Sequence, residues 1–226
     1  MRLLGMRAAV IAHQITAAIA LLLAAASPAA AQATQPASLV GTYDGHQMEM
    51  AAGLQLKADR RFRYALSYGA LDEEAAGTWT VSGGQVLLTS DPVIAPSFVL
   101  VSHDRGSDGT LQLNLDVPKG LSRQYFSAVI AKSNGETSRR QLSEDGLSVP
   151  FSRDDFPISV RMLFPVFSVI SEPFRLAAGS GYSLRFRFEP HDLGKVDFRG
   201  TPLKIINGDL LLDRHDRTIR FKRSRS

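Results

Sequence analysis

Three side chains that could bind a soft metal ion, His46, Met48 and Met50, alternate along one short segment. In an extended strand, alternate residues project from the same face. Imidazole and thioether groups on one face would suit copper(I). The alternation continues through Ala52, Leu54 and Leu56, however, and methionine commonly fills protein cores. The pattern therefore favours the buried face of a strand over 46–57 and no metal site, with copper handling as the alternative.

Three further histidines, His103, His191 and His215, each precede an aspartate. A histidine and an aspartate can form part of a catalytic triad or of a metal site. No serine elbow accompanies them, because Gly179-Ser180-Gly181 lacks the glycine two residues before the serine that a hydrolase elbow requires. We interpret these pairs as turn residues and expect a protein that is not an enzyme.

Asp72, Glu73 and Glu74 form a run of carboxylates in the segment 70–76. Clustered carboxylates can bind a hard cation or raise one another's pKa. Adjacent residues in a loop point in different directions, and glycines flank this segment. We therefore interpret 70–76 as a solvated loop.

The candidate ligand-binding residues are the aromatic residues Tyr64, Tyr68 and Trp79. Tyr64 and Tyr68 continue an alternating run that begins at Phe62, and Trp79 precedes a Gly-Gly reversal. In a β-barrel, inward aromatic side chains either line a cavity for a small apolar ligand or fill it.

Composition excludes several classes of protein. Cysteine is absent from the 226 residues, which rules out disulfides, thiolate metal sites, a cysteine nucleophile and a lipid-anchored cysteine. A hydrophobic fraction of 44% and a mean hydropathy of −0.04 argue against disorder and against a polytopic membrane protein.

Residues 1–33 have the features of a secretory signal peptide. Arg2 and Arg7 precede an uncharged run over 15–26, and the small residues at 29–33 form a cleavage region. The run is shorter than the roughly 20 apolar residues of a membrane span. We expect export to the periplasm, cleavage near Thr34 and no transmembrane segment.

Positive charge is concentrated at the C-terminus, where only Asp216 opposes the basic side chains. Such a tail could contact phosphate or lipid headgroups, but it lacks the interleaved aromatic residues of a nucleic-acid site. We expect no nucleic-acid partner and interpret the tail as a solubilising, frayed terminus. Its basic residues are Arg214, Arg217, Arg220, Lys222, Arg223 and Arg225.

The elements that position these residues are strands. Apolar and polar residues alternate over 62–68, 111–115 and 184–188, the pattern of half-buried antiparallel strands. Turn dipeptides separate the alternating runs, and Asn207-Gly208 lies within a particularly clear hairpin pattern. No segment of the mature chain has a sustained helical period, so we expect an all-β barrel or sandwich. The other dipeptides are Asp44-Gly45, Gly83-Gly84, Asp108-Gly109, Asn134-Gly135 and Asp145-Gly146.

Residues 40–90 resemble the opening meander of bacterial lipocalin-like envelope proteins. The resemblance rests on Gly41-Thr42-Tyr43, Leu54-Gln55-Leu56 and Gly77-Thr78-Trp79. It implies a lipocalin-like antiparallel barrel. The copper-responsive envelope lipoproteins share such a meander, but their lipidated cysteine and paired-cysteine motif are missing from this chain, which leaves an analogy of fold.

The middle of the chain is similar to transthyretin-like modules of secreted bacterial proteins, on the strand and acidic Asp-Gly turn pattern of 126–162. We expect a signal peptide (1–33), a barrel (38–103 and 182–223) and a β-sandwich inserted into it (104–181). Two consecutive domains meeting near residue 116 are the alternative. The function expected is that of a non-enzymatic periplasmic binding or accessory protein, which carries a small apolar ligand or docks an envelope protein.

Overall fold

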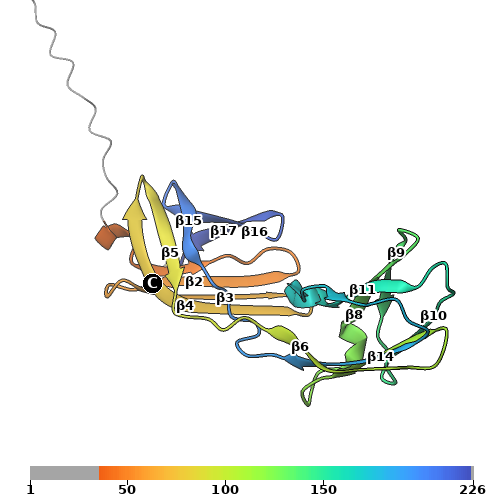
Figure 1. Cartoon of the computed structure of the whole chain (residues 1–226). Helices are drawn as coiled ribbons and strands as arrows, with labels where there is room; N and C mark the ends of the chain where they lie inside the picture. The colour runs from red at the N-terminus through yellow and green to blue at the C-terminus, as the bar shows by residue number, and fades with distance from the viewer. Residues whose placement is uncertain (1–35, 225–226) are drawn as a thin grey trace, which may run out of the picture. The chain divides into compact units, whose positions relative to one another are not determined.

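The computed structural model describes residues 36–224 (Figure 1), so the expected signal peptide lies outside the described residues. Apart from three short 3₁₀ turns, η1 (Pro36–Leu39), η2 (Arg123–Tyr125) and η3 (Pro165–Phe167), all regular structure in this range is β. The all-β prediction is confirmed. Over 36–224, no helix has the length and hydropathy needed to cross a membrane.

Eight strands close into an antiparallel barrel, as the resemblance implied. Each strand pairs with its neighbours in sequence order, and β17 pairs with β1 to close the ring. The chain leaves this meander once, between β5 and β15. The strands are β1 (Gly41–Asp44), β2 (Met50–Leu56), β3 (Arg61–Tyr68), β4 (Leu71–Ser82), β5 (Gln85–Ser90), β15 (Arg199–Ile206), β16 (Asp209–Arg214) and β17 (Arg217–Arg223).

Two-residue turns in which both residues have positive φ connect three of the barrel hairpins. Gly83 and Gly84 have φ of 56° and 72°, and Asn207 and Gly208 have φ of 53° and 86°. These conformations match the twist of the flanking strands and favour Gly and Asn. The predicted reversals at these two sites are confirmed. His215 and Asp216, with φ of 53° and 55°, form the turn between β16 and β17, as interpreted from the sequence.

Inward side chains of the barrel follow the predicted alternation. Along β3, Phe62, Tyr64 and Leu66 are buried and the residues between them are more exposed. Every second residue of a strand must face the same side, so one apolar stripe per strand is enough to fill the interior.

The expected loop at 70–76 is instead the first half of β4. Leu71 and Ala75 face inward and are buried, whereas Asp72 and Glu74 face outward. Leu71, Glu73 and Ala75 thus project from one face of the strand. The three adjacent carboxylates make this alternation hard to recognise in the sequence. Pairing of β4 with all of β3 stabilises the strand through backbone hydrogen bonds that do not depend on side-chain polarity.

The expected strand over 46–57 begins only at Met50. Backbone hydrogen bonds join Gln47 and Met50 in both directions, so Met48 and Glu49 form the tip of the β1–β2 hairpin. Glu49 has φ of 62°, a turn conformation. His46 and Met48 therefore do not belong to the inward face that the alternation predicted.

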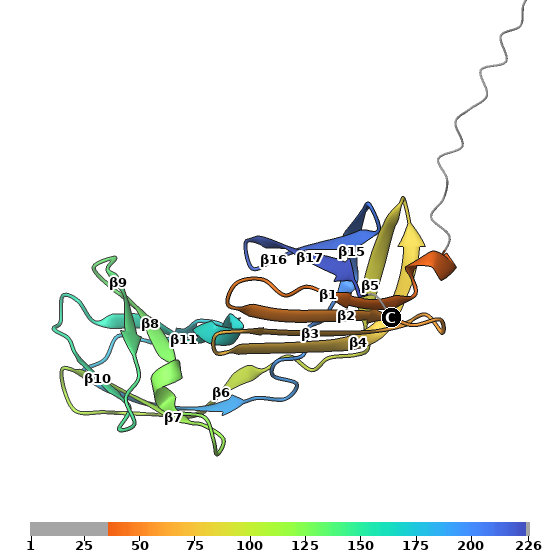
Figure 2. The same ribbon diagram turned by 180° about the vertical axis from the view of Figure 1, so that it is seen from behind.

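Residues 97–189 form two further sheets (Figure 2). Inward residues of both sheets share one core, including Leu113, Phe186, Ile130 and Met162, so the pair is a β-sandwich. One sheet has the order β10 (Leu147–Pro150), β7 (Thr110–Asp116), β14 (Tyr182–Glu189), β6 (Ser97–Asp104). The other has the order β12 (Val169–Ile170), β11 (Pro157–Phe164), β8 (Ser127–Lys132), β9 (Thr137–Gln141), with β13 (Phe174–Arg175) paired to β11.

The sandwich is inserted into the barrel sequence, but it extends beyond the expected range 104–181. Strands β6 and β14, expected in the barrel, pair with each other and β14 pairs with β7. The β7–β14 pairing is parallel, whereas the alternation was interpreted as antiparallel throughout. Alternation specifies which residues are buried, and it carries no information about the partner strand or its direction.

The basic C-terminus is ordered as β17 up to Arg223, so the expectation of a frayed tail is wrong over this range. Arg220 forms an ion pair with Asp209 of the neighbouring strand. Arg223 donates hydrogen bonds to the carbonyl oxygens of Ser38 and Val40, 2.7 and 2.6 Å away. These basic side chains help to close the barrel between β1 and β16.

Candidate functional site

The three predicted ligand-binding residues lie in the barrel but not together. Trp79, only 1% exposed, donates a hydrogen bond from Nε1 to the carbonyl oxygen of Lys57 and lies under the guanidinium of Arg60. Tyr64 lies in the middle of β3, where it pairs with Ala75 of β4, and Tyr68 is the last residue of β3, beside the turn into β4. The structure places Tyr68 toward one end of the barrel, Trp79 toward the opposite end and Tyr64 between them.

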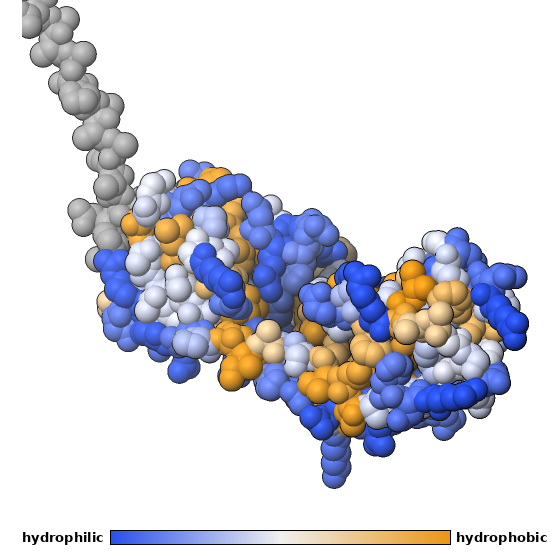
Figure 3. Space-filling model, viewed as in Figure 1, coloured by the Kyte–Doolittle hydropathy of each residue, from blue (hydrophilic) through white to orange (hydrophobic). Residues whose placement is uncertain are grey.

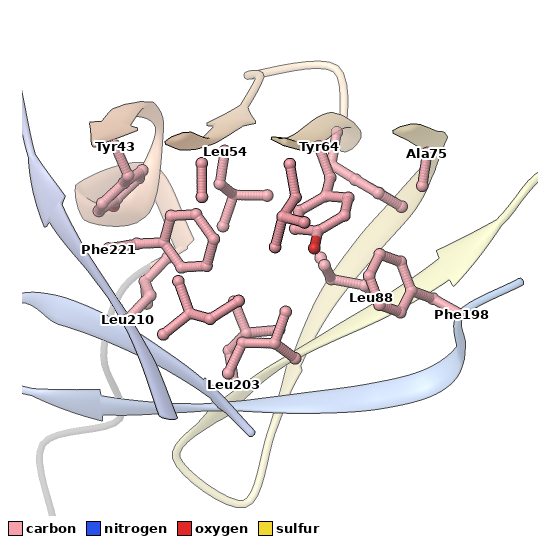
Figure 4. Close-up of a cluster of buried hydrophobic side chains, with 14 of the residues drawn as sticks. Tyr43, Leu54, Tyr64, Ala75, Leu88, Phe198, Leu203, Leu210 and Phe221 are labelled. Atoms are coloured by element: carbon pink, nitrogen blue, oxygen red, sulfur yellow. The ribbon is translucent and has the colours of Figure 1, made fainter. Parts of the chain in front are cut away.

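The barrel's own side chains surround Tyr64. Figure 4 shows Tyr64, Leu203 and Phe221, from three strands, pointing toward one another. The Tyr64 ring lies 5.2 Å from that of Phe198 and 6.4 Å from that of Phe221, measured between ring centroids. Only 3% of Tyr64 is exposed, so neighbouring side chains of the barrel cover most of its surface.

A buried carboxylate that the sequence analysis assigned to a loop lies beside Tyr64. The Glu73 side chain faces into the barrel and is 8% exposed. Arg214 Nη2 and Nε donate to its two oxygens at 2.6 and 2.7 Å, and the Tyr64 hydroxyl donates at 3.3 Å. His215 Nε2 lies 3.1 Å from Glu73 Oε1. These four residues, Glu73, Arg214, His215 and Tyr64, are called the Glu73 cluster below.

Burial and charge act in opposite directions on the Glu73 cluster. Burial alone raises the pKa of the Glu73 carboxyl, but hydrogen bonds and charge from Arg214 and then His215 outweigh it, and the pKa lies below its ordinary value. Burial, followed by the negative charge of Glu73, raises the pKa of the Tyr64 hydroxyl. The cluster therefore holds an ionised carboxylate next to a neutral phenol. The charge of this carboxylate is paired with Arg214 of the same chain.

Tyr68 has its own cationic partner at this end of the barrel. The guanidinium carbon of Arg217 lies 4.7 Å from the centre of the Tyr68 ring, and Arg217 Nη2 donates to the Tyr68 hydroxyl at 2.9 Å. Glu73, Arg214 and Arg217 are not recognisable from the sequence as partners of these tyrosines. A signal for Glu73 exists in the alternation Leu71, Glu73, Ala75, but nothing in the sequence pairs β4 with residues about 140 positions later.

The copper-binding set considered above does not converge. Met50 is 6% exposed and belongs to the barrel core, whereas Met48 is 87% exposed at the hairpin tip. His46 Nδ1 is hydrogen-bonded to Asp44. Within the part of the chain that the structure describes, no group of three or more His, Asp or Glu residues has an arrangement that could hold a metal ion.

The remaining histidine–aspartate pairs occupy separate structural positions. His103 is not a turn residue as expected: it lies in β6, and its ring packs on that of Phe174, 5.1 Å between centroids. His191 has φ of 41° in the turn after β14, and its Nε2 lies 3.4 Å from Glu189 Oε2. Each histidine thus has a local partner.

A different kind of candidate site is the free edge of the sandwich at β6. Among the described strands, β6 pairs only with β14. The other sandwich edges are short or polar: β10 has four residues and ends in Pro150, β12 and β13 have two residues each, and β9 has the sequence Thr-Ser-Arg-Arg-Gln. The eight residues of β6 contain the apolar run Phe98–Val101. It is the one long apolar edge within the described sandwich.

The surface along β6 is also apolar. Phe98 and Leu100 pack against the sandwich core, whereas Val101 is 46% exposed and Ile94, just before the strand, is 62% exposed. Figure 3 shows apolar surface gathered along β6 and the segment that precedes it. An edge strand with unpaired backbone groups and apolar side chains is a template for a further strand.

No protein-family model, curated protein sequence or solved structure matches this chain. The compatibility of the fold with that of lipocalins therefore rests on the barrel itself, with its eight antiparallel strands in sequence order.

Proposed function

We propose that this chain is an exported, non-enzymatic accessory protein of the bacterial envelope, related in fold to lipocalin-like envelope proteins, and that it docks an extended segment of another protein along β6. The observation that carries the proposal is the apolar, unpaired edge of β6. The barrel serves as the scaffold into which the docking sandwich is inserted.

Packing inside the barrel supports docking over carriage of a small apolar ligand. Tyr64 and Trp79, which were expected to contact such a ligand, have less than a twentieth of their surface exposed. Room for a ligand would require repacking of the core, which costs free energy. Docking at β6 requires no such change.

Strand addition supplies both affinity and selectivity. The free N–H and C=O groups of an edge strand bond to the backbone of an extended partner, and alternate side chains of that partner meet the exposed apolar residues. Natural edges that must stay unpaired are usually short, charged or interrupted by proline. The other sandwich edges have these features, whereas in β6 they are limited to a bulge at Val101 and the terminal Asp104.

Site-specific photo-crosslinking in living cells tests the docking. Benzoylphenylalanine replaces Val101 in one variant and Ile206 in a matched control, because both are large apolar strand residues of similar exposure, 46% and 43%. We expect a discrete adduct with another protein from position 101 only. A second substitution, Val99→Lys, should abolish this adduct by placing a charge on the same edge.

Equal adducts from positions 101 and 206, or none from 101, would contradict docking at β6. An adduct of twice the mass of the chain would show self-association and would contradict a different protein as the partner. Thermal unfolding of each variant, compared with that of the wild type, separates loss of docking from loss of folding.

Export is tested independently by mass spectrometry of the protein isolated from its native host. We expect an N-terminus between Gln32 and Thr34, since small residues precede each of these positions. A cytoplasmic protein that retains Met1 would contradict the envelope location.

A further inference from the structure

Three arginines from three strands lie on the outer face of the sheet formed by β9, β8, β11 and β13. Val129 of β8 pairs with Arg139 on one side and with Arg161 on the other, so all three share a face. Ser159, two residues before Arg161 on the same face, pairs with Arg175 of β13. The alternate residues of these strands, such as Ile130 and Val160, are fully buried in the sandwich core.

The spacing allows the guanidinium group of Arg161 to approach those of Arg175 and of Arg139. Neighbouring strands lie about 4.8 Å apart, and residues two positions apart on a strand are separated by about 6.6 Å. These values place the Cα atoms of Arg161 and Arg175 about 8 Å apart, and those of Arg161 and Arg139 about 10 Å apart. An extended arginine side chain spans more than half of either separation.

None of these arginines is neutralised by the protein. Arg139, Arg161 and Arg175 make no ion pair with any described residue, in contrast to Arg185 and Arg187 of β14, which pair with Asp116 and Glu189. The outward positions of the four strands within the described residues also carry no carboxylate. They are Ser127, Val129, Ala131, Thr137, Arg139, Gln141, Ser159, Arg161, Leu163 and Arg175.

The same face is hollowed beside Arg161 and Arg175, whereas Arg139 lines a separate depression. A depression of about 320 Å³ has a floor that includes Val129 and Ala131, and Arg161 and Arg175 contribute to its wall. The hydroxyl groups of Thr137 and Ser159 also line it. Small side chains on the floor leave open space, and the long cationic side chains beside it remain free to turn toward a ligand.

We propose that this depression, called the arginine face below, is a binding site for phosphoryl groups, with Arg161 and Arg175 as the principal ligands and Arg139 as a further positive charge on the same face of the sheet. Planar guanidinium groups donate paired hydrogen bonds to phosphate oxygens, and hydroxyl groups complete the set of donors. A phosphate monoester carries nearly two negative charges at neutral pH, which suits a site with three cations and no acid. The phosphoryl group belongs either to a soluble phosphate ester or to a phospholipid headgroup.

This site is independent of docking at β6, because β6 belongs to the other sheet of the sandwich. Either proposal can fail without the other. The variants that test them share no residue.

The test is a titration with inorganic phosphate at constant ionic strength, followed by the NMR signals of the backbone and of arginine Nε groups. The site variant is the double substitution Arg161→Gln and Arg175→Gln. The control, Arg63→Gln with Lys119→Gln, removes the same charge from exposed positions outside this sheet. We expect saturable shifts centred on Arg161 and Arg175, and affinity about tenfold lower in the site variant but unchanged in the control.

A single Arg161→Lys substitution refines the test, because lysine keeps the charge and loses the paired donors. It should weaken phosphate binding measurably while leaving the net charge unchanged. If only net charge mattered, Arg161→Lys would bind as the wild type does, and the assignment of Arg161 as a principal ligand would fail.

Sedimentation with vesicles distinguishes the two sources of the phosphoryl group. Binding to phosphatidylglycerol vesicles that inorganic phosphate competes away identifies a headgroup, whereas titration by phosphate without vesicle binding identifies a soluble ester. Both outcomes support the site. Three results would overturn it: scattered shifts that do not saturate, equal loss of affinity in the site variant and the control, or vesicle binding without any titration by phosphate.

Discussion

The guanidinium of Arg214 binds both oxygens of the Glu73 carboxylate, across 141 residues of sequence, at the end of the barrel where β3 turns into β4. Glu73 lies on β4 and Arg214 is the last residue of β16. The pair therefore joins a strand that precedes the inserted sandwich to one that follows it. Burial of a charge without a partner is costly, so this contact ties correct closure of the barrel to correct pairing of the two side chains.

The pairing predicts a large cost for removing only one charge. Glu73→Leu should lower the free energy of unfolding by about 2 to 3 kcal/mol, because Arg214 is left largely buried without its carboxylate. Adding Arg214→Met should recover part of this loss. Urea unfolding of the two single variants and the double variant gives the coupling energy.

The exposed pair Arg220–Asp209 is the internal control for that cycle. Arg220→Met should cost less than about 1 kcal/mol, because solvent screens an ion pair whose arginine is about half exposed. If the mutant cycle of the Arg220–Asp209 pair gave the same coupling energy as that of the Arg214–Glu73 pair, burial of Glu73 would not contribute to the coupling energy.

Stability should fall in acid through Glu73. Arg214 and His215 hold the pKa of the folded carboxyl below its unfolded value of about 4.5. The folded state thus binds fewer protons, and the stabilisation is complete above that pH and is lost as the pH falls through the lower, folded pKa. The difference in unfolding free energy between wild type and Glu73→Gln should be constant near neutrality and narrow below about pH 4.5. A difference that stays constant down to pH 3 would contradict this linkage.

Close backbone contact at Gly77 predicts a position-specific effect of a single methyl group. A Cβ on Gly77 would clash with the backbone carbonyl oxygen of Thr89, whereas a Cβ on Gly53, also in a barrel strand, would meet nothing within 4 Å. Gly77→Ala should therefore cost about 1 to 3 kcal/mol, and Gly53→Ala should be neutral or slightly stabilising. Thermal unfolding of both variants tests this prediction. Equal changes in stability would contradict the difference in close backbone contact between Gly77 and Gly53.

We predict that Met48 and Met50 do not bind copper(I) together. Met50 lies in the core and Met48 at the hairpin tip, so replacing both with leucine should not change titration with copper(I) under reducing, anaerobic conditions. Met50→Leu should cost less than about 1.5 kcal/mol, since leucine nearly conserves its volume. Tight wild-type binding that disappears in a folded double variant would instead establish a metal site.

The sequence alone determined which residues are buried in most strands, because alternation with period two is a local property of an extended chain. It predicted Met50 to Leu56 and Phe62 to Leu66 as inward faces and several reversals, including Asn207-Gly208. It erred where polar residues occupy inward or paired positions. Glu73 faces the barrel interior because strand pairing stabilises β4 despite its carboxylates, and the sequence carries no local mark of Arg214 as its partner.

Tertiary structure decided which strands are neighbours and which edges stay free. The alternation in β6 and β14 is the same whether they lie in a barrel or in a sandwich, so only long-range pairing assigns them to the sandwich and leaves β6 at its edge. Likewise, Arg139, Arg161 and Arg175 are unremarkable along the chain and become one site only when β9, β11 and β13 join one sheet. Local sequence patterns specify the buried face of a strand, whereas a binding surface depends on contacts between residues far apart in sequence.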